Sequence, residues 1–278
     1  MRYLPSAIGV FTVLPAPVID LDRTVARHLI LRLPLVGAVL GGIAAVIGLA
    51  LGWYSRNNQL GAAVGLAVLA ACTGAMHLDG LADTADGLGS RKPPEEALDI
   101  MRRSDIGPMG VATLVLVLVL QWAALSGLPP VIMAAALVAG PIVGRAACVR
   151  ATGAWRPGAR QSGFGALFTQ VTSRRSAWWT LVATLAGVWA IGLVAITIED
   201  FASHPHLLGI PSAYLEVLLH LSVLDTLWFV AAAIVALLVG SVATHRFQAR
   251  FGGLTGDTFG AIIELSTLAF WLVAAGTR

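Results

Sequence analysis

The chain has 278 residues, of which 57% are hydrophobic and 12% are charged, and its net charge is +3. Soluble domains carry about 25% charged residues, so this composition excludes an ordinary soluble protein. The basic residues cluster in a few loops, which argues against nucleic-acid binding. The mean hydropathy of +0.82 and uncharged runs long enough to cross ~30 Å of hydrocarbon predict an all-α polytopic integral membrane protein.

Seven apolar segments are expected to cross the bilayer. In chain order they are residues 33–54, 60–78, 109–126, 130–148, 177–197, 226–243 and 258–276. Four glycines in the first segment would let a neighbouring helix approach closely: Gly37, Gly41, Gly42 and Gly48. The sequence contains no repeat, low-complexity tract or long linker, so residues 1–278 are expected to form a single membrane domain.

The basic residues predict which loops face the cytoplasm. Four segments, counted with Arg145 at the edge of the third, hold 16 of the 18 Lys and Arg residues: 1–32, 79–108, 149–176 and 244–257. Cytoplasmic loops carry the excess of Lys and Arg, so all four are expected on that side. This placement requires seven crossings, with residues 198–225 outside and not fully spanning.

Three aspartates lie where the second expected span meets water. Asp79, Asp83 and Asp86 are spaced i, i+4 and i+7, so on a helix they share a wedge about 60° wide. Carboxylates this close repel one another unless a cation lies among them, and their oxygens suit a hard divalent ion, above all Mg²⁺. A solvated helix end is the plainer alternative. Acids near membrane depth are by default functional, so we expect these aspartates to bind Mg²⁺.

A second group of candidate residues lies at the start of the last expected span. Residues 251–257 contain three glycines, and the free backbone amides around Gly253 and Gly256 are expected to bind an anion. Asp257 and Glu264 are seven residues apart and share a helix face, which makes both candidate metal ligands. The alternative is a glycine-rich turn with Glu264 paired to an arginine.

The third group is basic. Arg102, Arg103, Arg145 and Arg160 are candidate phosphate ligands. Topology or lipid headgroups alone would also account for arginines at these positions.

Two further residues are candidates for the site. Asp105 is a candidate metal ligand or helix cap, and His77 is a candidate catalytic residue or a partner for a neighbouring helix. Metal-binding acids, an anion site and arginines on one membrane face together indicate phosphoryl transfer, which depends on charge neutralisation and positioning.

The sequence from His77 to Leu88, HLDGLADTADGL, closely resembles the signature of the cobalamin synthase family, the adenosylcobinamide-GDP ribazoletransferases. Further matches run almost from end to end: FTVLP at 11–15, PLVG at 34–37, RSDIGPMG at 103–110, RQSGFG at 160–165 and GLTGD at 253–257. The aspartate motif is highly specific, whereas the short N-terminal motifs would mean little alone.

The resemblance implies a Mg²⁺-dependent transferase of the bacterial inner membrane, with its active site facing the cytoplasm. Its substrates would be adenosylcobinamide-GDP and α-ribazole or its phosphate, and its products adenosylcobalamin or its phosphate, and GMP. Its partners would be the lipid bilayer and, as candidates, a second copy or other corrinoid-pathway enzymes. The implied metal ligands are Asp79, Asp83 and Asp86, with Asp257 and Asp105 as additions. The group that takes the hydroxyl proton stays open among His77, Asp86 and Asp105.

Two other functions fit part of the pattern. The CDP-alcohol phosphotransferases share a DxxDG motif, which Asp83 to Gly87 matches, but their pattern continues with a glycine and two aspartates. Here Ile100, Ser104 and Pro108 occupy those places. A cation transporter would carry acids near mid-span on several helices, whereas only Glu264 fits, and it would not account for the arginine-rich loops.

Overall fold

The computed structural model describes residues 3–17, 19–160, 162–203 and 212–276. These ranges are mostly helical and contain two isolated β-bridges between loops. The helices are α1 (Leu4–Phe11), α2 (Arg23–Ile30), α3 (Leu33–Ser55), α4 (Asn58–Cys72), α5 (Met76–Gly89), α6 (Pro94–Ile100), α7 (Pro108–Ser126), α8 (Pro130–Ala151), α9 (Phe164–Leu167), α10 (Arg174–Ser203), α11 (Ser212–Phe251) and α12 (Gly256–Ala275). The predicted all-α fold is confirmed for the described residues.

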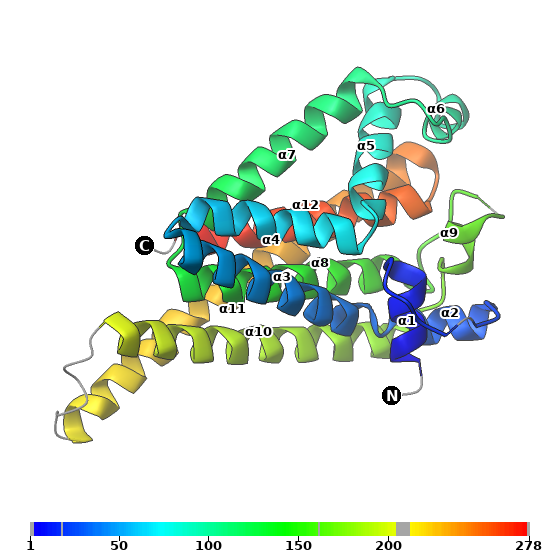
Figure 1. The fold of residues 1–278 in the computed structure, drawn as a ribbon. Coiled ribbons are helices and arrows are strands. Elements are labelled where there is room, and N and C mark those ends of the chain that lie inside the picture. Colours follow the sequence, from blue (N-terminus) through cyan, green and yellow to red (C-terminus); the bar gives the residue numbers. More distant parts are fainter. Residues whose placement is uncertain (1–2, 18, 161, 204–211, 277–278) are drawn as a thin grey trace.

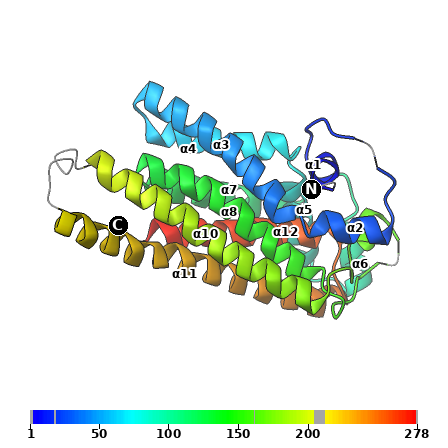
Figure 2. The same cartoon turned by 90° about the horizontal axis from the view of Figure 1, so that it is seen from below.

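The long helices form a bundle with a polar layer at one end. Helices α3, α4, α8, α10, α11 and α12 run along the bundle, and α7 crosses it at a slant (Figure 1). Helices α1, α2 and α6 gather at the same end in both views, and α5 lies across that end (Figures 1 and 2). The opposite end holds the turn between α7 and α8 and the C-terminal end of α12 (Figure 1). The loops expected to be cytoplasmic therefore meet at one end of the bundle.

Within the described ranges, six helices are long and apolar enough to cross a membrane, and α4 with α5 makes a seventh crossing if the bent pair counts as one. The expected span over 60–78 is interrupted, because α4 ends at Cys72 and α5 leaves it at 87°. Gly74 and Ala75 both have φ of +58°, a left-handed conformation that ends a right-handed helix. We treat α4 as the membrane segment and α5 as lying across the polar end, outside the spanning segments.

One other loop prediction needs revision, and a second lies partly outside the described residues. The expected polar loop 244–257 is mostly helix, because α11 continues to Phe251, and only residues 252–255 form the turn before α12. The polar residues of this stretch do not end α11. The helix ends at Phe251, and the next residue, Gly252, has a left-handed φ of +74°, as is common just after a helix. Of the segment 198–225, expected outside the membrane, residues 204–211 lie outside the described ranges. Helix extends up to this gap and resumes after it, at Ser203 and Ser212.

Helix α8 lies at the centre of the bundle and packs against α3, α10, α11 and α12. Glycines on α3 permit this approach, because a Cβ at Gly37 or Gly41 would lie 2.5 Å from a carbonyl oxygen of α8. Gly48 meets α4 in the same way, whereas Gly42 faces open space. The prediction of close helix packing is thus confirmed at three of the four glycines. The central position of α8 also buries Arg145.

Candidate functional site

The acidic site forms where α5 crosses the first turn of α12. Gly80 is buried at the crossing, and a Cβ there would lie 2.6 Å from the carbonyl oxygen of Asp257. Gly260 makes the reciprocal approach, since its Cβ would lie 3.1 Å from the carbonyl oxygen of His77. Only residues without side chains allow the two backbones to come this close. This packing role of Gly80 was not predicted from the sequence, although a glycine within an acidic helix could have indicated a close approach to another helix.

The start of α12 is fixed by several backbone contacts. Thr255 caps the helix in a capping box with Thr258. The amide of Leu254 donates to the carbonyl oxygen of Pro157 at 3.1 Å, and the Leu254 carbonyl accepts from the amide of Ala159 at 2.9 Å. The turn expected to bind an anion therefore already uses the amides of Leu254 and Thr255 within the protein.

The two glycines expected to bind an anion have different surroundings. Gly253 is buried, and a Cβ there would collide with Gly158 and Ala159. Gly256 is exposed at the first position of α12. Of the two, Gly253 therefore serves packing, and Gly256 remains accessible.

The acids of α5 and α12 interact electrostatically. The pKa of Asp83 is raised to about 7, chiefly by burial and then by the charges of Asp79, Asp257 and Asp86, while Arg160 opposes the shift. Arg160 Nη1 lies 3.9 Å from Asp257 Oδ2, and its Nη2 donates to the carbonyl oxygen of Leu98 at 2.7 Å. The site thus combines several carboxylates with one arginine that reaches them.

The chemistry of these donors fits Mg²⁺. Among the residues that the structure describes, no three His, Cys, Asp or Glu side chains already form a cluster that could hold a metal ion. Asp79, Asp83 and Asp257 nevertheless lie near enough for their charges to act on one another, and Asp79 and Asp257 line the same cavity. Mg²⁺ is bound through one or two carboxylates and keeps several waters, so it does not need a closed cage of protein ligands. A cation at this face would offset the repulsion among the carboxylates.

Asp86, the third acid of the motif, binds the start of α7. Its Oδ2 accepts from the amide of Gly107 at 2.7 Å and its Oδ1 from the amide of Gly110 at 2.8 Å. A Cβ at either glycine would collide with this carboxylate. A carboxylate at a helix N-terminus satisfies free amides and complements the helix dipole. Gly107 and Gly110, on either side of Pro108, were the feature of the sequence that could have indicated the close approach of a side chain to the start of α7.

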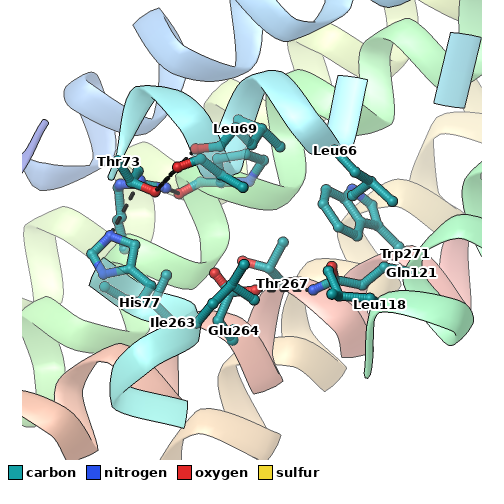
Figure 3. A pocket seen from close by; sticks show the side chains of 14 residues that line it. Leu66, Leu69, Thr73, His77, Leu118, Gln121, Ile263, Glu264, Thr267 and Trp271 are labelled. Atoms are coloured by element: carbon teal, nitrogen blue, oxygen red, sulfur yellow. Dashed lines mark hydrogen bonds between the residues drawn. The ribbon is translucent and has the colours of Figure 1, made fainter. Parts of the chain in front are cut away.

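Three other candidate residues lie in a separate polar cluster inside the bundle. His77, Arg145 and Glu264 line a pocket of about 40 Å³ together with Gln121, and Figure 3 shows Glu264 of α12 between His77 of α5 and Gln121 of α7. Gln121 Nε2 donates to Glu264 Oε2 at 3.0 Å, and Arg145 Nη2 lies 3.4 Å from His77 Nε2. Sequence reasoning missed Gln121, because one amide in an apolar helix carries no signal.

The remaining candidates lie at the surface near the start of α7. Arg102 is exposed and pairs with Asp99 at 3.7 Å. Arg103 and Asp105 are also exposed, and neither forms an ion pair with any residue in the described ranges. The structure therefore brings Asp79, Asp83, Asp257 and Arg160 together. Arg102 lies near enough to Arg160 for their charges to interact, whereas Arg103 and Asp105 are exposed in the loop before α7.

Comparison with known proteins yields one family. The family model described as cobalamin-5-phosphate synthase matches residues 3–275. A relative from Thermoanaerobacter sp. (strain X514) is 32% identical over 270 residues, which cover 96% of this chain and 94% of the relative. A relative from Chlorobaculum tepidum is 31% identical, and the match covers 98% of this chain and 94% of the relative. A relative from Frankia casuarinae is 34% identical, and the match covers 92% of this chain and 87% of the relative. All three are named adenosylcobinamide-GDP ribazoletransferase. No solved structure matches the chain.

Proposed function

This chain belongs to the cobalamin-5-phosphate synthase family and is a transferase of cobalamin biosynthesis, and we propose that its adenosylcobinamide-GDP ribazoletransferase reaction takes place where α5 meets α12. The hydroxyl of α-ribazole or its phosphate attacks the phosphorus that carries adenosylcobinamide. A new P–O bond forms, the bond to GMP breaks, and the hydroxyl proton is lost. The observation that carries this assignment is the convergence of Asp79, Asp83 and Asp257 beside Arg160.

In this proposal Asp79, Asp83 and Asp257 hold Mg²⁺. Bound Mg²⁺ neutralises charge on the phosphoryl oxygens, which phosphoryl transfer requires. Arg160 contacts the pyrophosphate from the side of Asp257, and its planar guanidinium suits two phosphate oxygens at once. Arg102 and Arg103 are exposed, and the charge of Arg102 acts on Arg160, so in this proposal they extend the basic surface that receives the donor.

We assign positioning roles to Asp86 and His77. Both oxygens of Asp86 accept amides of α7, so the carboxylate fixes the end of α5. Arginine donates and never accepts, so the contact with Arg145 directs the Nε2 lone pair of His77 toward the guanidinium. That lone pair is then unavailable to take the acceptor's proton.

The two alternative functions are not favoured. The family match covers nearly the whole chain and names neither a CDP-alcohol phosphotransferase nor a transporter. Glu264, the acid within the last span, hydrogen-bonds with Gln121 beside the buried Arg145, which does not suit a transported cation. The several apolar helices indicate a multi-pass membrane protein. We propose that it lies in the bacterial inner membrane with the polar end in the cytoplasm, as the basic loops at that end favour.

The test uses the purified full-length protein in lipid nanodiscs with adenosylcobinamide-GDP and α-ribazole. GMP release should require Mg²⁺. Asp83→Asn should abolish it, because the variant loses a charged ligand, while Asp20→Asn, at an exposed acid in the N-terminal loop, should behave like the wild type. No GMP from the wild type would refute the function, and unchanged Mg²⁺ dependence in Asp83→Asn would refute the metal role.

A further inference from the structure

An apolar cavity of about 150 Å³ lies directly beside the acidic site. Asp79 and His77 of α5 and Asp257 of α12 line one side of it. The other walls come from five further helices, α1, α2, α3, α8 and α9, and from apolar residues of α5 and α12. The carboxylates proposed to bind Mg²⁺ thus also form the polar rim of an apolar chamber.

Phenylalanines from three helices form much of the chamber's wall. Phe168 is 2% exposed, and its ring centroid lies 5.3 Å from that of Phe11 and 5.0 Å from that of Phe164. Phe164 is 50% exposed and stands edge-on to Phe168. Cys148 of α8 is 2% exposed and lines the same cavity. The chamber therefore has an aromatic, buried interior and one aromatic side chain at its open side.

We infer that this chamber binds the flat apolar base of the acceptor nucleoside and directs its sugar toward Asp79 and Asp257. This inference rests on the proposed function and names a subsite for one substrate. An apolar cavity of about 150 Å³ is large enough to bind benzene, and aromatic side chains pack favourably against a flat ring. The dimethylbenzimidazole base of α-ribazole has this character, since its methyl groups and fused rings are apolar.

The other parts of the substrates fit the chamber poorly. Guanine carries hydrogen-bonding groups along its edges, and burying them against phenylalanine and cysteine would leave them without partners. A corrin ring is much larger than a cavity of this volume. A lipid chain would fill the chamber without bringing a hydroxyl to the aspartates. The acceptor base is the substrate part that matches both the apolar interior and the acidic rim.

The test changes the volume and the aromatic wall of the chamber separately. Cys148→Met fills the interior, and Cys72→Met is its matched control, because Cys72 lies on α4 and does not line the cavity. Phe164→Ala removes the half-exposed aromatic ring, a change that the fold should tolerate. The full-length protein in nanodiscs is assayed for the KM of each substrate. Binding of α-ribazole alone is measured by the fluorescence of its base.

Both variants should raise the KM and dissociation constant of α-ribazole at least about tenfold, because even a single methylene gained or lost in an apolar pocket has an effect of this size. The KM of adenosylcobinamide-GDP should not change. Cys148→Met should also lower the preference for α-ribazole over the nucleoside with unmethylated benzimidazole, a shift that general misfolding would not produce.

Three results would overturn the inference: an increase in the donor KM alone, unchanged constants in both variants, or equal losses in Cys72→Met and Cys148→Met. The binding assay separates this failure from that of the proposed function. Tight α-ribazole binding that the variants weaken supports the subsite even where no GMP is released. If the wild type releases GMP and both variants keep the wild-type KM and dissociation constant of α-ribazole, the subsite is refuted and the proposed function is not.

Discussion

Replacing Asp86 with asparagine should destabilise the protein without removing its metal dependence. The carboxylate accepts two amides at the start of α7, from Gly107 at 2.7 Å and Gly110 at 2.8 Å. Asparagine keeps one carbonyl oxygen and replaces the other oxygen with an NH₂ group, which cannot accept. One of the two amides therefore loses its partner and faces another donor.

The expected cost follows from the two interactions lost. A hydrogen bond to a charged group contributes about 1.5–3 kcal/mol. The interaction of a negative charge with the dipole at a helix N-terminus contributes about 0.3–1 kcal/mol. Together they predict a loss of about 2–4 kcal/mol in the free energy of unfolding, a large share of the stability of an ordinary domain.

The assay is urea unfolding of the purified variant in detergent micelles, with Asp105→Asn as the control. Asp105 lies in the same loop region but is exposed, so its variant should unfold like the wild type. Mg²⁺ titration of GMP release by the folded Asp86→Asn protein should give the wild-type half-saturating concentration. Wild-type stability together with weakened Mg²⁺ dependence would refute the capping role and make Asp86 a metal ligand.

Three further outcomes are expected. Protonation of Asp83, whose pKa is raised to about 7, should compete with Mg²⁺; the Mg²⁺ concentration that gives half-maximal GMP release should therefore rise as the pH falls below 7. Gly80→Ala should lower kcat at least ~10-fold, because its Cβ would push α5 away from α12, and active-site misplacement is costly. Gly42→Ala, where a Cβ meets nothing within 4 Å, should leave kcat unchanged. Gln121→Leu removes the hydrogen-bond donor of Glu264 and should cost about 1–3 kcal/mol in urea unfolding.

The helices and the acidic motif could be predicted from the sequence because both depend on local spacing. Apolar runs of sufficient length mark spans, and the i, i+4, i+7 spacing places the aspartates on one helix face. The bend between α4 and α5 could not be predicted in this way, because residues 60–76 are apolar apart from Thr73 and contain no proline. Left-handed backbone at Gly74 and Ala75, which the sequence does not indicate, produces it.

The functions of individual acids depend on partners that are distant in the sequence. Asp86 shares a helix face with Asp83, yet its carboxylate binds amides more than twenty residues later. Asp257 and Glu264 share a face of α12, but seven residues of helix correspond to roughly 10 Å along its axis. That distance carries Glu264 from the acidic site to the cluster with Gln121 and Arg145. Spacing predicts the face of a helix on which a residue lies, and it does not predict what that face meets.

Helix α5 is held at three points, and this explains which of its acids can respond to a cation. His77 contacts Arg145 at its start, Gly80 packs on α12 near its middle, and Asp86 binds α7 near its end. The backbone that carries the aspartates is therefore fixed relative to three spanning helices. Within the described ranges neither Asp79 nor Asp83 is hydrogen-bonded to another helix, so rotation of their side chains is the movement by which they would reach the proposed cation. A variant that separates α5 from α12, such as Gly80→Ala, should consequently lower Mg²⁺ affinity while leaving every carboxylate in place.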